Sequence, residues 1–170
     1  MKTGFYSHSL FLEHNTGAHP ENAERLRAIQ NRLQSEGILN NLELHSGRQA
    51  TSKDIAMLHK DSLFDEVRQA SEEGRNFLHS PDCVVSEKTF TAALQAVGSV
   101  LEAVEEVSDQ RLDNAFCAVR PPGHHAERDQ VMGFCFFNNI ALAAEYLTRH
   151  LGYRRVLIFD FDVHHGNGTQ

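Results

Sequence analysis

The segment Val156-Leu-Ile-Phe-Asp-Phe-Asp-Val163 decides the expected fold, because it is a short apolar run that ends in two carboxylates. Such runs, rich in branched and aromatic residues, are typical of parallel strands that are covered on both faces. Before it, residues 140–151 carry apolar side chains at helical spacing, and residues 115–119 form a second apolar run. A strand, a loop, a helix and a strand in this order predict a right-handed crossover in a parallel sheet. The expected fold class is therefore α/β, with a parallel sheet and helices on both of its faces.

Three more helices are predicted nearer the amino terminus. Residues 20–37 begin with a proline, which suits the first helical position, and end with Gly37, which can adopt the left-handed conformation that stops a helix. Residues 61–73 and residues 86–107 carry apolar side chains at intervals of three and four, with Ser86 as the expected N-cap of the longer helix. Residues 8–19 show no such period and are expected to form a loop. No internal repeat or linker divides the chain, which favours one domain or part of one.

The composition excludes several classes of protein. The 170 residues carry 16 Lys and Arg against 23 Asp and Glu, a net charge of −7, which argues against nucleic acid or an anionic membrane as a partner. No apolar stretch approaches the ~20 residues that a membrane span requires, and the first residues lack the features of a secretory signal. The 3 cysteines lie far apart without a CxxC spacing, so we expect reduced core thiols in a cytoplasmic protein.

Three polar side chains occupy alternate positions at the end of the last predicted strand: Asp160, Asp162 and His164. Residues two apart in a strand point to the same face, and ligands bind at the carboxyl ends of strands in open α/β sheets. Asp162 and His164 offer an oxygen and a nitrogen ligand, a pair that suits Zn²⁺. The alternative is a strand end whose carboxylates cap nearby backbone amides. The glycine-spaced turn at residues 165–168 favours the metal site, because glycines let the chain approach a bound group closely.

A second polar motif, Arg120-Pro-Pro-Gly-His-His125, directly follows a predicted strand. Its prolines stiffen the loop, and the imidazoles of His124 and His125 could serve as base and acid in a mechanism with a metal-bound water. A histidine pair on a loop is by itself more often a solvated surface feature. Residues 133–139 are either an apolar entry into the next helix with an Asn cap, or an aromatic pocket wall beside the site.

Together these motifs resemble the histone deacetylase superfamily, the zinc-dependent deacetylases, and within it the class II and bacterial members. The resemblance rests on residues 120–126, 133–138 and 160–168 in this order, and residues 19–26 and 81–83 are similar to further motifs of the family. It spans nearly the whole chain and implies the arginase/deacetylase fold. We expect residues 1–170 to be the amino-terminal part of a single deacetylase domain, truncated at its carboxyl side.

The resemblance also implies a role for each motif residue. Asp162 and His164 would be two of three zinc ligands, and Asp160 would join Asp162 and the His164 carbonyl around a structural potassium ion. His125 would act as general base and acid beside His124, an assisting imidazole that Asp160 would hydrogen-bond.

The same resemblance assigns the partner and substrate residues. Asn167 would partner His125. Gly133 and Phe134 would form one wall of a tunnel for an acyl-lysine stem, and Asp82 would bind substrate amides at the rim. The third zinc ligand, an Asp, and a carbonyl-polarising Tyr would lie beyond Gln170.

The expected activity is zinc-dependent hydrolysis of acetyl or short acyl amides, with a metal-bound water as nucleophile. Acetylated lysine, acetylated polyamines and other small acetylated amines all fit the residues present. We expect the activity to belong to the complete protein, with this fragment alone inactive. Two alternatives stay open: an arginase-type ureohydrolase with two manganese ions, and a non-catalytic module that binds acyl-lysine.

Overall fold

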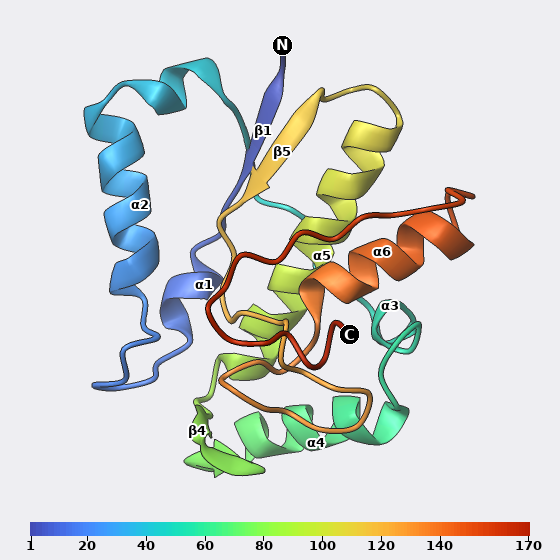
Figure 1. Ribbon diagram of the computed structural model, residues 1–170. Helices are drawn as coiled ribbons and strands as arrows, with labels where there is room; N and C mark the ends of the chain where they lie inside the picture. Colours follow the sequence, from blue (N-terminus) through green and yellow to red (C-terminus); the bar gives the residue numbers. More distant parts are fainter.

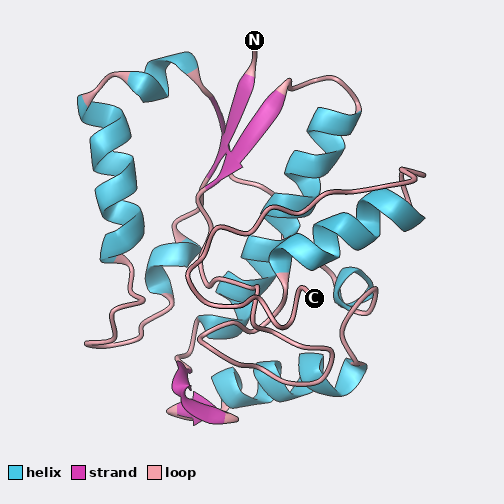
Figure 2. Cartoon of the chain, in the orientation of Figure 1, coloured by secondary structure: helices cyan, strands magenta, loops and turns pink.

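A three-stranded parallel sheet lies at the centre of the computed structural model, which describes residues 1–170 (Figures 1 and 2). Its strands are β1 (Thr3–Tyr6), β2 (Glu43–His45) and β5 (Asn114–Cys117), in the order β2-β1-β5. The predicted α/β class with a parallel sheet is confirmed. Strand β5 corresponds to the apolar run predicted at residues 115–119. Strands β1 and β2 were not predicted, because four and three residues are too few to display a period.

Helices cover both faces of this sheet, with α2 (Glu24–Ser35) on one side and α5 (Thr89–Ser108) on the other (Figure 1). Successive side chains of a strand point to opposite faces. In β1, Phe5 belongs to the buried cluster that contains Leu26 of α2, whereas Tyr6 packs with Ala103 of α5.

The remaining elements are short or lie away from the sheet. Among them, β3 and β4 pair as an antiparallel hairpin. None of the helices is both long and apolar enough to cross a lipid bilayer. These elements are α1 (Leu10–Glu13), the 3-10 helix η1 (Ile38–Asn41), α3 (Ser52–Ile55), α4 (Asp61–Glu72), β3 (Phe77–Leu78), β4 (Ser80–Val84) and α6 (Asn139–Arg149).

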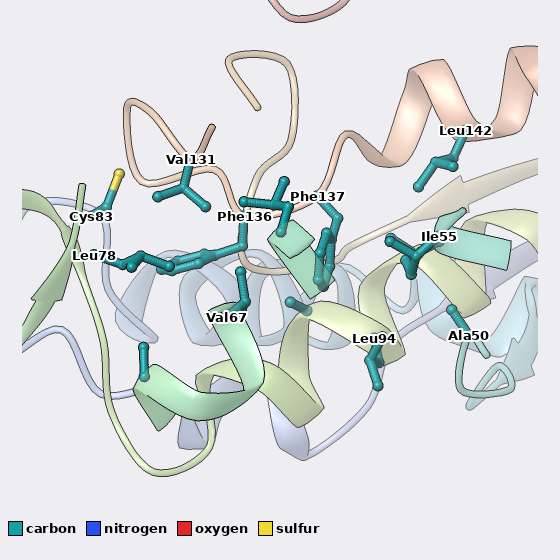
Figure 3. Packing of buried hydrophobic residues seen from close by; sticks show 14 of the residues in the cluster. Ala50, Ile55, Val67, Leu78, Cys83, Leu94, Val131, Phe136, Phe137 and Leu142 are labelled. Atoms are coloured by element: carbon teal, nitrogen blue, oxygen red, sulfur yellow. The ribbon is translucent and has the colours of Figure 1, made fainter. Parts of the chain in front are cut away.

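The largest buried cluster joins α4, α5 and the aromatic segment that precedes α6 (Figure 3). Phe136 and Phe137 are its largest members and are 0% and 1% exposed. They pack against Leu63 and Val67 of α4 and against α5. Within residues 133–139 the aromatic pair therefore belongs to the core, and Asn138 caps α6 by accepting a hydrogen bond from the Ala141 amide (3.1 Å).

The predicted helices at residues 61–73 and 140–151 are confirmed by α4 and α6, but α2 starts later than expected. The prediction that this helix begins at Pro20 is wrong, because it begins at Glu24. The carbonyl of Glu21 accepts hydrogen bonds from Thr16 and Arg120, and the chain at residues 20–23 forms bends and a turn instead of a helix. Gly37 has a φ of +67°, as expected for a residue that stops a helix.

The prediction that Ser86 caps α5 is also wrong, because that helix begins at Thr89 with Lys88 as its N-cap. The Ser86 hydroxyl accepts a hydrogen bond from the Asn15 amide (3.0 Å), and the Ser86 amide donates to the Thr89 hydroxyl (2.7 Å). The Ser86 hydroxyl thus binds the 8–19 region, and the Ser86 amide binds the first residue of α5.

The strand predicted at residues 156–163 is wrong, because this segment belongs to no strand of the structure. It runs beside α5 and α6 (Figure 1), and a cavity of about 520 Å³ lies between it and β5. Without a neighbour at hydrogen-bonding distance, no ladder forms. Apolar side chains at alternate positions of the segment are 82% to 92% exposed, namely Leu157, Phe159, Phe161 and Val163.

Two buried histidines make the stability of this fold dependent on pH. Burial, with the nearby Arg120 charge, lowers the pKa of His14 to about 3, and burial also lowers the pKa of His59. Both are neutral when folded, whereas in the unfolded chain they bind protons below pH ~6.5. The unfolded state therefore binds more protons in acid, and the free energy of unfolding should fall as the pH drops from about 6.5 towards 3.

Urea unfolding of the full-length protein at a series of pH values measures this slope. His14→Gln should remove up to ~1.4 kcal/mol per pH unit of the decrease, because one titrating group is lost. The matched control is His150→Gln, which alters an exposed histidine at the end of α6. An unchanged slope in the His14 variant would contradict the neutral buried state.

Candidate active site

A cleft of about 360 Å³ brings together residues from motifs that are far apart in the sequence. It lies where the loop after β5, the turn at residues 133–134 and the segment at residues 160–168 meet. Six of the predicted site residues line it: His124, His125, Gly133, Phe134, Asp162 and His164. Asp160 and Asn167 do not line the cleft but hydrogen-bond the two histidines that do.

His125 is held in one tautomer by Asn167. The side-chain amide of Asn167 donates to the Glu127 carboxylate (2.7 Å) and to the His125 carbonyl (3.3 Å), so its Oδ1 is the acceptor that faces the ring. The His125 Nδ1–H donates to this oxygen (2.7 Å). The neutral imidazole therefore keeps the lone pair of Nε2 available to accept a proton.

His124 lies against His125, with 4.0 Å between the ring centroids, and it is oriented by Asp160. Because an ionised carboxylate only accepts hydrogen bonds, the His124 Nδ1–H is the donor to Asp160 Oδ2 (2.8 Å). This bond, together with one from the Asp162 amide, lowers the pKa of Asp160. Asp160 thus stays ionised and favours a proton on His124 Nδ1.

Asp162 and His164 converge, and their side chains are of types that can bind a metal ion. Asp162 Oδ1 lies 3.0 Å from His164 Nδ1 and accepts a hydrogen bond from the His164 amide (2.8 Å). The backbone bond and then the imidazole contact lower the pKa of Asp162, which is therefore ionised at neutral pH. A carboxylate oxygen beside an imidazole nitrogen fits zinc. No group of three or more His, Cys, Asp or Glu side chains in the chain is arranged to hold a metal ion.

The turn at Gly133 and Phe134 brings the cleft wall close to His125. Both residues have a positive φ, +52° and +57°. A Cβ atom at position 133 would lie 2.4 Å from Cδ2 of His125, so only glycine permits this approach. On its other side, the ring of Phe134 packs against the edge of His19, with 4.9 Å between centroids.

Asp82 is exposed on β4 and is not among the residues that line the cleft. Its neighbour Cys83 is buried and accepts a hydrogen bond from the Ser80 hydroxyl (3.7 Å). Burial raises the pKa of Cys83, and all three cysteines are free thiols. The substrate-binding role of Asp82 stays a prediction.

Several charged or polar residues at this site have no role predicted from the sequence. His19, Glu21 and Arg25 line the cleft, and Arg120 is buried behind it. One signal pointed to Arg120: an arginine that directly follows an apolar strand must find acceptors if it is buried. Nothing local indicated that those acceptors lie about a hundred residues earlier, since Glu21 and Arg120 are 99 positions apart.

Comparisons with known proteins agree with the motifs of this cleft. Residues 19–170 match the model of the histone deacetylase domain. Histone deacetylase 9 of Homo sapiens is 38% identical over 99% of this chain, and histone deacetylase 5 of Arabidopsis thaliana is 35% identical over 99% of it. The chain covers 19% and 27% of these two relatives.

The fold is similar to that of a solved structure as well. The crystal structure of the HDA15 HD domain superimposes with a TM-score of 0.93 and 34% sequence identity. The match covers 99% of this chain and 49% of the solved one, so the chain spans about half of that structure.

Proposed function

This chain belongs to the histone deacetylase family, and from that premise we propose that the protein containing it hydrolyses acetyl or short acyl amides on lysine-type amines. One observation carries the proposal. The paired rings of His124 and His125 share a cleft with the converging donors of Asp162 and His164, and the rings of His125 and His164 are 6.1 Å apart. We further propose that residues 1–170 are the amino-terminal part of a single deacetylase domain.

Asp162 and His164 would hold a zinc ion. When bound, zinc supplies Lewis acidity, which polarises an acyl carbonyl and acidifies water. Asp160, with Asp162 and the His164 carbonyl, would in addition hold potassium.

The chain's own residues manage the proton and the substrate. His125 Nε2 takes a proton from the attacking water and returns it to the leaving amine, since Asn167 keeps the proton of the neutral ring on Nδ1. His124, which Asp160 orients through Nδ1, assists its neighbour electrostatically. Gly133 and Phe134 bound the cleft on the side where an acyl-lysine stem would lie.

The decisive experiment combines metal analysis and turnover on the full-length protein. We expect one zinc per chain and hydrolysis of acetyl-lysine peptide, with acetylated polyamine as the competing substrate. Two manganese ions with hydrolysis of a guanidinium substrate would support the ureohydrolase alternative instead. Peptide that is bound but never cleaved would support the binding-module alternative.

Asp162→Asn tests the proposed ligand directly. The variant keeps the side-chain shape but removes the negative charge of the side-chain oxygens. Zinc affinity should fall by at least ~10²-fold, because loss of a direct ligand weakens metal binding more than loss of a residue that only orients a ligand. The control is Asp109→Asn, which removes an exposed carboxylate paired with Arg111. Equal zinc content in both variants, measured by elemental analysis, would exclude Asp162 as a ligand.

A further inference from the structure

Arg120 begins the loop that carries the two cleft histidines, and its side chain is buried, with 1% exposed. Its Nε–H donates to Glu21 Oε1 (2.7 Å), in an ion pair whose side chains are 2% and 3% exposed. The two Nη groups donate to four further acceptors, so every N–H of the guanidinium is used. These acceptors are the carbonyls of Phe11 (3.0 Å), His14 (2.5 Å) and Glu21 (3.4 Å) and the hydroxyl of Thr16 (3.0 Å).

All five acceptors lie within residues 11–21, and this segment is itself fixed to α5. The ring nitrogen Nδ1 of His14 lies 2.8 Å from the Thr89 hydroxyl, and the Asn15 amide donates to the Ser86 hydroxyl (3.0 Å). His19, farther along the segment, packs against Phe134 of the cleft wall. The segment thus connects the wall on one side with the histidine loop on the other.

An ion pair at this depth is a costly way to gain stability. Removing two charges from water costs several kcal/mol, and apolar residues of similar size are often as stable. The arrangement instead fixes the orientation of the Arg120 side chain. A planar guanidinium whose five N–H groups are all bound has one orientation, which a lysine with three donors on a flexible stem cannot reproduce.

We propose that Arg120 and Glu21 are positioning residues, which fix the loop of His124 and His125 relative to the cleft wall. The inference rests on the proposed function for its catalytic consequence. The other end of the loop is held separately, because the Asn138 side chain donates to the Ala126 carbonyl (3.4 Å). Beside Arg120, the Asn139 side chain donates to the Pro121 carbonyl (3.2 Å). We call the bonds between Arg120 and residues 11–21 the arginine clamp. Loss of this clamp should therefore displace the loop without unfolding it.

The test compares three variants of the full-length protein. Arg120→Lys keeps the charge but loses the fork, and Glu21→Ala loses the acceptor. Both should lower kcat by at least ~10-fold while KM stays within about twofold, because small displacements of a catalytic group act on the transition state and not on substrate binding. Glu21→Gln keeps an oxygen at Oε1 and should restore kcat to within about threefold of the wild type. The control variants are Arg27→Lys and Glu24→Gln, which change an exposed ion pair on α2.

Amide hydrogen exchange gives a readout that does not depend on activity. Exchange in residues 120–126 should rise in Arg120→Lys and Glu21→Ala, while exchange in α5 stays as in the wild type. An equal rise of exchange in α5 would show a general loss of stability and would overturn the positioning role. An unchanged kcat, or a KM that changes in parallel with kcat, would overturn it as well. A wild-type protein without deacetylase activity would instead overturn the proposed function, and the exchange data would still decide whether Arg120 holds the loop.

Discussion

Replacement of His125 by alanine in the full-length protein is expected to reduce kcat for acetyl-lysine peptide by ~10² to 10⁴-fold, the range that general acid and base catalysis contributes. The reason is the tautomer set by Asn167, which leaves His125 Nε2 as the proton acceptor of the cleft. Zinc content should not change, because the proposed ligands, Asp162 and His164, are untouched. Steady-state kinetics and elemental analysis of the same preparation measure both quantities.

His150→Ala serves as the control for this variant, since it removes an exposed imidazole at the end of α6. It should leave kcat and zinc content unchanged. A His125→Ala protein that turns over at the wild-type rate would remove this residue from the mechanism. Loss of zinc from the variant would make His125 a ligand instead of a base.

Gly133→Ala should produce the second large effect. The new Cβ would lie 2.4 Å from Cδ2 of His125, so the imidazole or the turn must move, and a displacement of about 1 Å can cost ~10²-fold in rate. The positive φ of +52° adds backbone strain of roughly 1–2 kcal/mol. We expect kcat to fall by about two orders of magnitude, with a modest loss of stability, as measured by kinetics and urea unfolding.

Gly74→Ala separates these two effects. Gly74 has a φ of +66°, but an added Cβ would meet nothing within 4 Å. It should therefore lose a similar amount of stability and keep its activity. If both alanine variants were equally active, the close approach of position 133 to His125 would have no catalytic consequence.

The longer helices could be predicted because their apolar spacing extends over several turns. Helices α4 and α6 each contain about three turns of this pattern, and their bounds agree with the expectation. Strands β1 and β2 contain too few residues for any period. At residues 156–163 the alternation is genuine, but a strand also requires a neighbour for its backbone hydrogen bonds, and no pattern within the segment reveals whether one is present.

The candidate site could be predicted residue by residue where a motif carries its own chemistry. Asp162 and His164, like His124 and His125, lie close together in the sequence, and the structure brings both pairs into one cleft. The arginine clamp could not be predicted in the same way. Its two charged partners are distant in the sequence, and only the folded chain shows that both are buried.

The four outward-facing apolar side chains of residues 157–163 determine how this molecule can be handled in the laboratory. Each is 82% or more exposed, and the segment combines high β-propensity with no proline, which favours aggregation. Asp160 and Asp162 are the charges that oppose it. A recombinant product limited to residues 1–170 would expose this surface at every concentration used for purification.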